Sequence, residues 1–336
     1  MRRYVLALVT FGVTIAAVLS ILFGETNDPG SMIIATIGMP VSVLLLTRAV
    51  LTPPEGTRPG VGSFVFGATV VPSAVLLLGA LATGVLVAAT DPLRAAVVDL
   101  GNELNASSDF LDILFAGWAF LVIVELAFVA PLLEETLKPF GALVARPRTR
   151  SEALLFGAAA GAGFAAIENI AYASGWMWGA EWWIPISVVR MSGSALHVLG
   201  TALIALAIFE RGQPKEERLV SLPGAFAVAI SIHALWNGSI AVAIVTFAGH
   251  EQLGLPNDRL GWGIGLLALL AATGAALLAA LLGVARSVRE GVPLRRVTSM
   301  DSIGRPEAIA AWVLVATWLL VPVGIAVTMF PDLISL

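Results

Sequence analysis

The chain has 336 residues and a mean hydropathy of +0.92; 58% of its residues are hydrophobic and only 12% are charged. Soluble domains carry about 25% charged residues, so this composition excludes a soluble globular protein and indicates an integral membrane protein. The sequence contains no cysteine, which excludes disulfides, a thiolate nucleophile and cysteine metal ligands. No basic stretch is long enough to indicate a nucleic-acid partner.

Apolar stretches of membrane-spanning length recur along the chain. A spanning helix needs about 20 apolar residues. Nine stretches meet this criterion, or seven to eight if an end segment lies at the membrane interface. The first follows Arg2 and Arg3 and is longer than the apolar core of a signal peptide, about 7 to 15 residues, so it predicts a retained helix. The predicted spans are 4–23, 32–51, 64–89, 111–133, 151–175, 183–209, 220–248, 260–285 and 308–330.

The charges in the connections predict an orientation. Basic residues gather before the first span, after the second, and in the connections 146–150, 210–219 and 286–307, whereas acidic residues gather in the others. The positive-inside rule then places the N-terminus in the cytoplasm and the C-terminus outside. Residues 90–110 are expected to form the longest outer loop.

The sequence has no linker that separates domains. We therefore expect residues 1–336 to form a single all-α integral membrane domain, a polytopic transmembrane helical bundle whose motif-bearing core is residues 111–248. The arginine-rich, lysine-poor composition is typical of a GC-rich bacterial source, so the expected location is the bacterial cytoplasmic membrane.

The fourth predicted span carries an adjacent pair of carboxylates, Glu134 and Glu135, followed by Lys138. Ionisable groups at membrane depth cost at least about 2.5 kcal/mol each, so such a pair indicates a function. In a helix, Glu134 and Lys138 are i and i+4 neighbours on one face, and Glu135 lies on the adjacent face.

The length of this helix decides how deep the pair lies. Pro131 and Pro139 are compatible with a kinked helix that continues to Ala145, which we favour and which places Glu134 near the middle of the bilayer. A helix that stops at Leu133 instead places the pair at the cytoplasmic surface.

The next three predicted spans carry further polar residues at helical spacings. Phe164 and Glu168 are four residues apart, in a span whose glycine and alanine face permits close helix approach. Polar side chains inside a membrane must satisfy one another, because lipid offers no partners. The candidates are, in chain order, Glu168, Asn169, Arg190, His197, His233 and Asn237.

Some polar or aromatic residues have a structural interpretation. In one structural interpretation, Glu125 forms an ion pair with Arg190. In another, the positive charges of Arg190 and Lys138 keep nearby carboxylates ionised. Phe164 and Trp236 are expected to pack. Three carboxylates and two histidines on four sequential spans are harder to explain structurally, and they indicate a function.

These residue types limit the reaction. The chain has neither a Gly-x-Ser-x-Gly elbow nor a His-Glu-x-x-His motif, which argues against a serine hydrolase and a conventional zincin. Carboxylates and neutral histidines either hold a divalent metal such as zinc that activates water, or a glutamate acts on water directly as a general base. Both routes are hydrolysis. The metal-free route is slightly favoured, because the set is rich in carboxylates and lacks a recognisable zinc spacing.

Four motifs in order within residues 125–240 resemble those of the PrsW family of intramembrane proteases, which is related to the CAAX prenyl proteases and the bacteriocin-immunity-type membrane proteases. The motifs are Glu134-Glu135-x-x-Lys138, Phe164-x-x-x-Glu168-Asn169, Arg190 to His197, and His233-x-x-Trp236-Asn237. The resemblance implies an endopeptidase in the lipid bilayer that cleaves a membrane-anchored protein, of the anti-sigma-factor type.

The resemblance also implies roles for individual residues. One of Glu134 and Glu135 activates water, His197 and His233 are the motif histidines, and Asn237 is their polar partner. Lys138, Arg190 and Asn169 support them. Glu168 stands where the CAAX-type relatives carry a histidine, which leaves the metal open. A metal would find its ligands among Glu134, Glu135, Glu168, His197 and His233.

The alternative is a proton-coupled transporter or channel that uses Glu134, Glu168, His197 and His233 as a relay. Many transporters are built from internal repeats, and the two halves of this sequence show none. We therefore favour the protease. The oligomeric state and the identity of the substrate are left open by the sequence.

Overall fold

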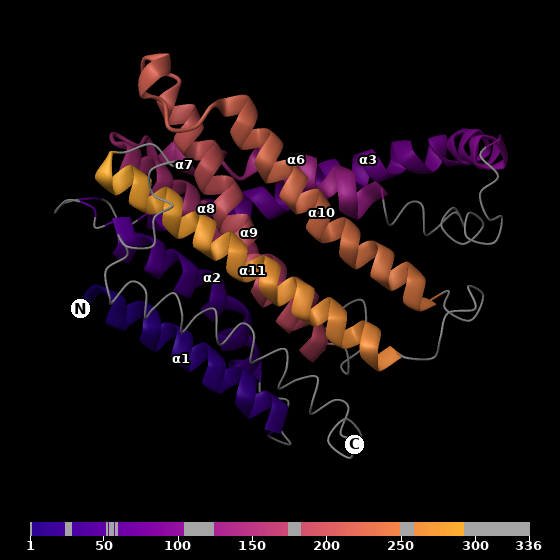
Figure 1. Ribbon diagram of the computed structural model, residues 1–336, viewed down its shortest axis with the longest axis horizontal. Coiled ribbons are helices and arrows are strands. Elements are labelled where there is room, and N and C mark those ends of the chain that lie inside the picture. Colours follow the sequence, from indigo (N-terminus) through magenta and orange to yellow (C-terminus); the bar gives the residue numbers. More distant parts are fainter. Residues whose placement is uncertain are drawn as a thin grey trace. The chain divides into compact units, whose positions relative to one another are not determined.

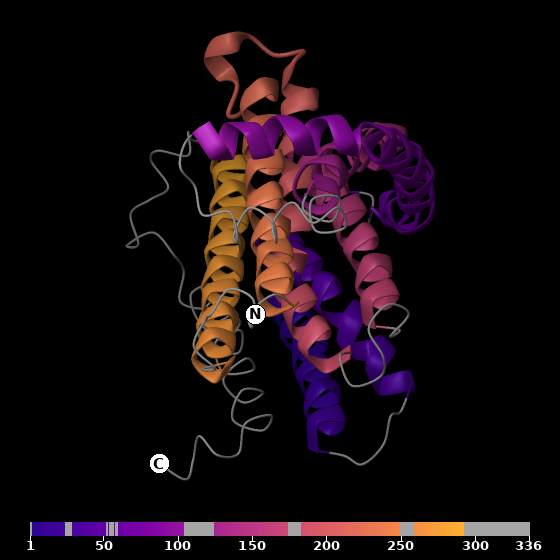
Figure 2. The same cartoon turned by 90° about the vertical axis from the view of Figure 1, so that its right-hand side faces the viewer.

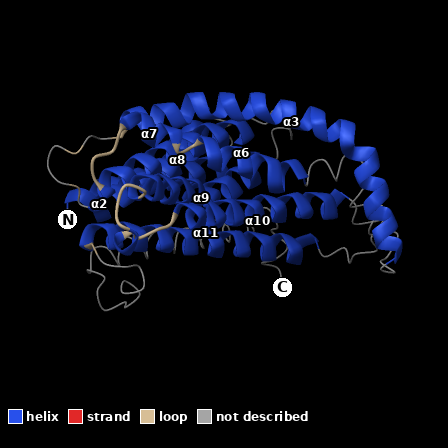
Figure 3. Cartoon of the chain, turned by 90° about the horizontal axis from the view of Figure 1, so that it is seen from above, coloured by secondary structure: helices blue, strands red, loops and turns tan. Residues whose placement is uncertain are grey.

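The computed structural model describes residues 2–23, 29–51, 60–103, 124–173, 183–248 and 259–291, together with the single residues 53 and 57. Within these ranges the chain forms helices joined by turns and contains no strand, so the predicted all-α class is confirmed (Figures 1 and 3). Five helical segments of the described part are long and apolar enough to cross a membrane. They are Val61–Leu86, Arg150–Tyr172, Gly193–Glu210, Leu222–Ala241 and Ala272–Glu290.

Most predicted spans coincide with helices. The matching elements are α1 (Arg2–Phe23), α2 (Pro29–Leu51), α3 (Val61–Glu103), α8 (Arg150–Ala173), α9 (Trp183–Glu210), α10 (Leu222–Ala248) and α11 (Arg259–Glu290). The last predicted span, 308–330, and the first part of the fourth, 111–123, lie outside the described residues. The number of spans and the orientation in the membrane therefore stay predictions.

The prediction of an outer loop from residue 90 is wrong for residues 90–103, which continue α3. The physical reason lies in the composition. Residues 93–100 are mostly alanine, leucine, valine and arginine, several of which favour helix, and the turn-forming Asn102, Asn105 and Ser107 come only afterwards. Pro92 does not end the helix, as is common in membrane helices.

The helix that carries the carboxylate pair continues past Leu133. A π-helical turn, η1 (Glu125–Val129), leads into α6 (Ala130–Leu137), and α7 (Phe140–Ala145) follows after a two-residue turn. The break falls at Lys138–Pro139 because proline has no N–H to donate and its ring clashes with the preceding turn. The backbone N–H of Ala142 donates to the Pro139 carbonyl at 3.0 Å and restarts the helix. The chain is helical again as far as Ala145, so the alternative of a helix that stops at Leu133 is wrong, but the expected continuous helix is interrupted at Lys138–Pro139.

The chain divides into two compact units, which are described separately. The first unit consists of residues 1–72, 138–229 and 260–336, and the second of residues 73–137 and 230–259. Both α3 and α10 begin in the first unit and continue into the second.

The first unit is built around α8 and α9. These two helices pack along each other, α2 packs against both, α1 packs against α2, and α7 packs against α8. Figures 1 and 2 both show α1 and α2 side by side. Most residues of Arg150–Tyr172 in α8 and of Gly193–Glu210 in α9 are buried inside the protein.

Glycines on α8 allow this close packing. A Cβ atom on Gly161 would overlap the backbone carbonyl oxygen of His197, and one on Gly157 would lie 2.8 Å from the carbonyl oxygen of Thr201. Earlier residues of α8 thus face later residues of α9, so the two helices are antiparallel. A Cβ on Gly163 would overlap the carbonyl oxygen of Phe64, at the start of α3. The predicted glycine face is confirmed, in line with the small residues typical of membrane helix interfaces.

Candidate active site

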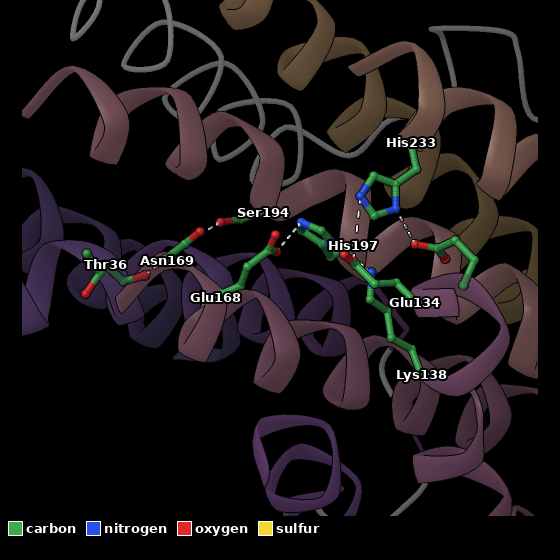
Figure 4. A network of polar contacts seen from close by, with 9 residues as sticks. Thr36, Glu134, Lys138, Glu168, Asn169, Ser194, His197 and His233 are labelled. Atoms are coloured by element: carbon green, nitrogen blue, oxygen red, sulfur yellow. Dashed lines mark hydrogen bonds and ion pairs between the residues drawn. The ribbon is translucent and has the colours of Figure 1, made fainter. Parts of the chain in front are cut away.

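In the second unit, the carboxylate pair of α6 meets His233 of α10. The Nδ1 atom of His233 lies 2.9 Å from Oε1 of Glu135, and its Nε2 atom lies 3.7 Å from Oε2 of Glu134. All three side chains are buried, and Figure 4 shows His233 and Glu134 of this cluster. The backbones come close here, since a Cβ on Gly238 of α10 would lie 3.3 Å from the Cβ of Ala127 in η1.

The two ring nitrogens of His233 face different carboxylates. An ionised carboxylate only accepts hydrogen bonds, so with Glu135 ionised the proton of His233 lies on Nδ1 and is donated to Glu135. The lone pair of Nε2 then points towards Glu134. A histidine oriented in this way by a carboxylate is the usual form of a histidine that binds a metal through its other nitrogen.

The donor atoms of this cluster fit a divalent cation. Glu134, Glu135 and His233 each offer one ligand atom, and these atoms lie within 4.8 Å of one another. Zinc binds carboxylate oxygen and imidazole nitrogen at about 2.0 to 2.2 Å, so two ligands of one ion can be up to roughly 4 Å apart. The 3.7 Å between Nε2 of His233 and Oε2 of Glu134 falls within that limit. The same two atoms can also hydrogen-bond a water molecule.

In the first unit, a second histidine bridges a cation and a carboxylate. The Nζ atom of Lys138 lies 2.8 Å from Nδ1 of His197, and Nε2 of His197 lies 3.0 Å from Oε2 of Glu168. Lys138 and His197 are almost completely buried, and Glu168 is largely so. These residues come from three segments: the turn after α6, α9 and α8. Figure 4 shows the run from Lys138 through His197 to Glu168.

The ring of Phe164 closes over Lys138. The ammonium nitrogen lies 4.2 Å from the ring centroid, within the range of a cation–π interaction. The rings of Phe164 and His197 have centroids 5.6 Å apart. The expectation that Phe164 only packs missed this contact. Its spacing of one helical turn before Glu168 was the signal that could have revealed it.

Asn169 connects three helices of the first unit. Its Nδ2 atom donates to the backbone carbonyl of Thr36 on α2 at 3.1 Å and to Oγ of Ser194 on α9 at 3.3 Å. The side chain is buried. The sequence placed Asn169 in a supporting role but gave no signal for Thr36, which lies 133 residues earlier in the chain.

The remaining candidates are less closely defined. Asn237 is buried and lies one turn after His233 on α10. Glu125 lies in η1 and hydrogen-bonds Thr83 of α3. Arg190 belongs to α9, but its side chain lies outside the described residues, as does His250. The suggested pair of Glu125 with Arg190 therefore stays a prediction, as do the roles of all the site residues.

A comparison with protein families finds a match to the model of the PrsW family intramembrane metalloproteases, over residues 61–255. This match covers more than half of the 336-residue chain and includes every residue of both histidine clusters. Comparisons with curated proteins and with solved structures gave no match. On the strength of the family match, and with apolar helices of membrane-spanning length in the same chain, this multi-pass membrane protein belongs to the PrsW family of intramembrane metalloproteases.

Proposed function

We propose that the protein is an endopeptidase of the bacterial cytoplasmic membrane that hydrolyses a peptide bond in a membrane-anchored protein substrate. One observation carries this proposal: two carboxylates and a histidine, all buried, converge on α6 and α10 within the region that matches the protease family. Burying ionisable side chains in a membrane protein costs free energy, so a buried set of this kind indicates a function.

The contacts of the cluster suggest a division of roles. Glu135 holds Nδ1–H of His233 at 2.9 Å and thereby orients the ring. Glu134, 3.7 Å from Nε2, is the carboxylate that we assign as the general base. It takes a proton from water as the water oxygen attacks the substrate carbonyl, and it returns that proton to the amine that leaves. A positioned general base contributes roughly 10²- to 10⁴-fold to a rate.

The cluster in the first unit is assigned a supporting part in the same reaction. The chain itself joins the two clusters, because Lys138 is the third residue after Glu135. We assign to His197 the stabilisation of the negative charge that develops on the substrate oxygen, as N–H donors do in other hydrolases, and to Glu168, 3.0 Å from its Nε2 atom, the positioning of the His197 ring. Asn237, one turn from His233, is assigned to the same task.

A metal ion would be held by Glu134 and by Nε2 of His233, while Glu135 would orient the ring from the Nδ1 side. When bound, such an ion lowers the pKa of its water and polarises the substrate carbonyl. Glu135 would orient His233 in both cases, whereas Glu134 would be a ligand when the ion is bound and the general base without it. Sensitivity to a chelator distinguishes the two routes.

The test uses full-length protein in liposomes with a panel of membrane-anchored peptides. Wild-type protein is expected to produce defined fragments by mass spectrometry, and His233→Gln is expected to reduce the rate at least ~10²-fold. Each assay is run with and without a strong chelator, followed by added zinc. Equal cleavage by His233→Gln and the wild type would refute the proposed site. Loss on chelation and recovery with zinc would establish the metal route.

A further inference from the structure

Trp236 lies on α10 close to the cluster of Glu134, Glu135 and His233, and it has no part in the reaction proposed above. The residue is only 4% exposed, and its Nε1–H group is buried without an acceptor among the described residues. An indole N–H can only donate a hydrogen bond. Native proteins rarely leave a buried donor without a partner, because this costs free energy, so the N–H group of Trp236 indicates a function.

The register of α10 against η1 and α6 places Trp236 beside the proposed site. Gly238 comes close to Ala127 in η1, whereas His233 contacts Glu135, which lies eight residues later in the chain than Ala127. The two helical stretches therefore run antiparallel, and Trp236 lies between these two contacts. All of these residues belong to the second unit.

Helix geometry relates the position of Trp236 to that of His233. Three residues of an α-helix advance about 4.5 Å along the axis, and residues three apart are neighbours on the helix surface. An extended peptide advances about 3.3 Å per residue. Along α10, Trp236 is therefore offset from His233 by one to two residues of an extended substrate.

A substrate that is cleaved in the membrane needs donors of this kind. Within a membrane helix, each backbone carbonyl accepts a hydrogen bond from the same helix. To bring a peptide bond to Glu134, the segment around it has to leave the helical conformation, and its carbonyl oxygens lose these bonds. Lipid offers them no donor. The N–H of Trp236 is chemically matched to such an oxygen, since it donates one hydrogen bond and accepts none.

We propose that Nε1–H of Trp236 donates a hydrogen bond to a backbone carbonyl of the substrate, one or two residues from the cleaved bond. Trp236 is then a positioning residue for the substrate, and this inference rests on the proposed protease function. Since Nε1 is covered in the structure, the substrate has to displace the atoms above it on entering. The accepting carbonyl does not react, so losing the contact raises KM and leaves kcat nearly unchanged, whereas a donor to the attacked carbonyl would act on kcat.

Solid-state NMR of protein in bilayers, labelled with ¹⁵N at the tryptophan indoles, observes this N–H group directly. The chain has nine tryptophans, and the signal that is lost in Trp236→Phe belongs to Trp236. In the free protein we expect the proton shift of an N–H without a hydrogen bond. A downfield shift is expected when a membrane-anchored peptide binds to Glu134→Gln, which leaves the peptide intact. A hydrogen-bonded signal in the free protein, or no shift with any peptide of the panel, would overturn the proposal.

Kinetics test the same contact by two routes. Trp236→Phe keeps an aromatic ring without the N–H group and is expected to raise KM about 5-fold, the equivalent of one net hydrogen bond, with kcat near that of the wild type. The control is Trp262→Phe on α11, for which KM is expected to be unchanged. A fall in kcat without a rise in KM would contradict the assigned role.

The second route changes the substrate and needs no variant of the protein. An ester carbonyl accepts hydrogen bonds more weakly than an amide carbonyl, so peptides with one amide replaced by an ester at successive positions locate the acceptor. One ester within two residues of the cleaved bond is expected to raise KM for the wild type, and Trp236→Phe is expected not to distinguish this ester from the amide. Equal KM values of the wild type for all these peptides would refute the contact.

The spectra and the cleavage assay separate this inference from the proposed function. A protein whose Trp236 signal shifts with a peptide that it does not cleave would refute the proposed function alone. Cleavage of a peptide that leaves the signal unshifted would refute the role of Trp236 alone.

Discussion

The contact between α8 and α9 gives a sharp prediction at Gly161. A methyl group at this position would overlap the backbone carbonyl oxygen of His197. Because that oxygen belongs to the backbone, no side-chain rotation can relieve the overlap. The two helices must therefore separate or slide in the Gly161→Ala variant. His197 is the residue of α9 that lies directly at this contact.

The size of the effect follows from the distances. Restoring ordinary contact requires a shift of about 1 Å, and overpacking of this kind typically costs 1 to 3 kcal/mol of stability, about 2 kcal/mol here. The Nζ–Nδ1 distance of 2.8 Å between Lys138 and His197 would lengthen towards 4 Å, which is too long for a hydrogen bond. A misplacement of about 1 Å can reduce a catalytic rate about 10²-fold.

The assay compares Gly161→Ala with Gly283→Ala, a helical glycine of α11 beside which a Cβ atom meets nothing within 4 Å. Thermal unfolding and kcat/KM on a membrane-anchored peptide are measured for both variants. Gly161→Ala is expected to lose stability and activity, whereas Gly283→Ala is expected to be active and up to about 1 kcal/mol more stable. Equal stability and activity of Gly161→Ala and the wild type would refute the packing argument.

Two further predictions concern stability. Asn169→Ala removes the side-chain hydrogen bonds that join α8 to α2 and α9, and we expect the variant to lose about 1 to 3 kcal/mol of unfolding free energy; a melting temperature equal to that of the wild type would contradict the assigned contacts. Glu210 is fully buried and accepts hydrogen bonds from Arg150 and from the backbone N–H groups of Leu219 and Val220. Glu210→Gln is expected to lower the free energy of unfolding by about 2 kcal/mol. The control Glu217→Gln should lower it little, because Glu217 contacts Arg150 through its backbone carbonyl. Equal melting temperatures of the two variants would contradict this prediction.

Much of the helical framework could be predicted because apolar length and helical spacing depend on the local sequence. The boundaries of α8 and α9 fall within about two residues of the predicted spans, and the break at Pro139 follows from the chemistry of proline. The end of α3 was missed because the acidic residues from Asp91 on and the turn-forming Asn102 and Asn105 indicated a polar loop, while the helix-favouring residues between them decided the local structure.

The site residues could also be identified from their types and spacings, but their pairing could not. The sequence suggested that Lys138 holds carboxylates ionised, whereas its contacts with His197 and Phe164 arise where α9 and α8 meet the turn after α6. Which of the two glutamates binds Nδ1 of His233 depends on the rotation of α6 relative to α10. Such details come from tertiary packing, which a helical spacing does not specify.

The most direct test of the proposed reaction compares the cleavage rates of Glu134→Gln and Glu125→Gln in liposomes. Both substitutions replace a carboxylate by an amide in the same stretch of helix, but only Glu134 lies beside Nε2 of His233. The account predicts a loss of at least ~10²-fold for Glu134→Gln and a nearly unchanged rate for Glu125→Gln. Cleavage by Glu134→Gln at the rate of the wild type would contradict the assignment of Glu134 as the base.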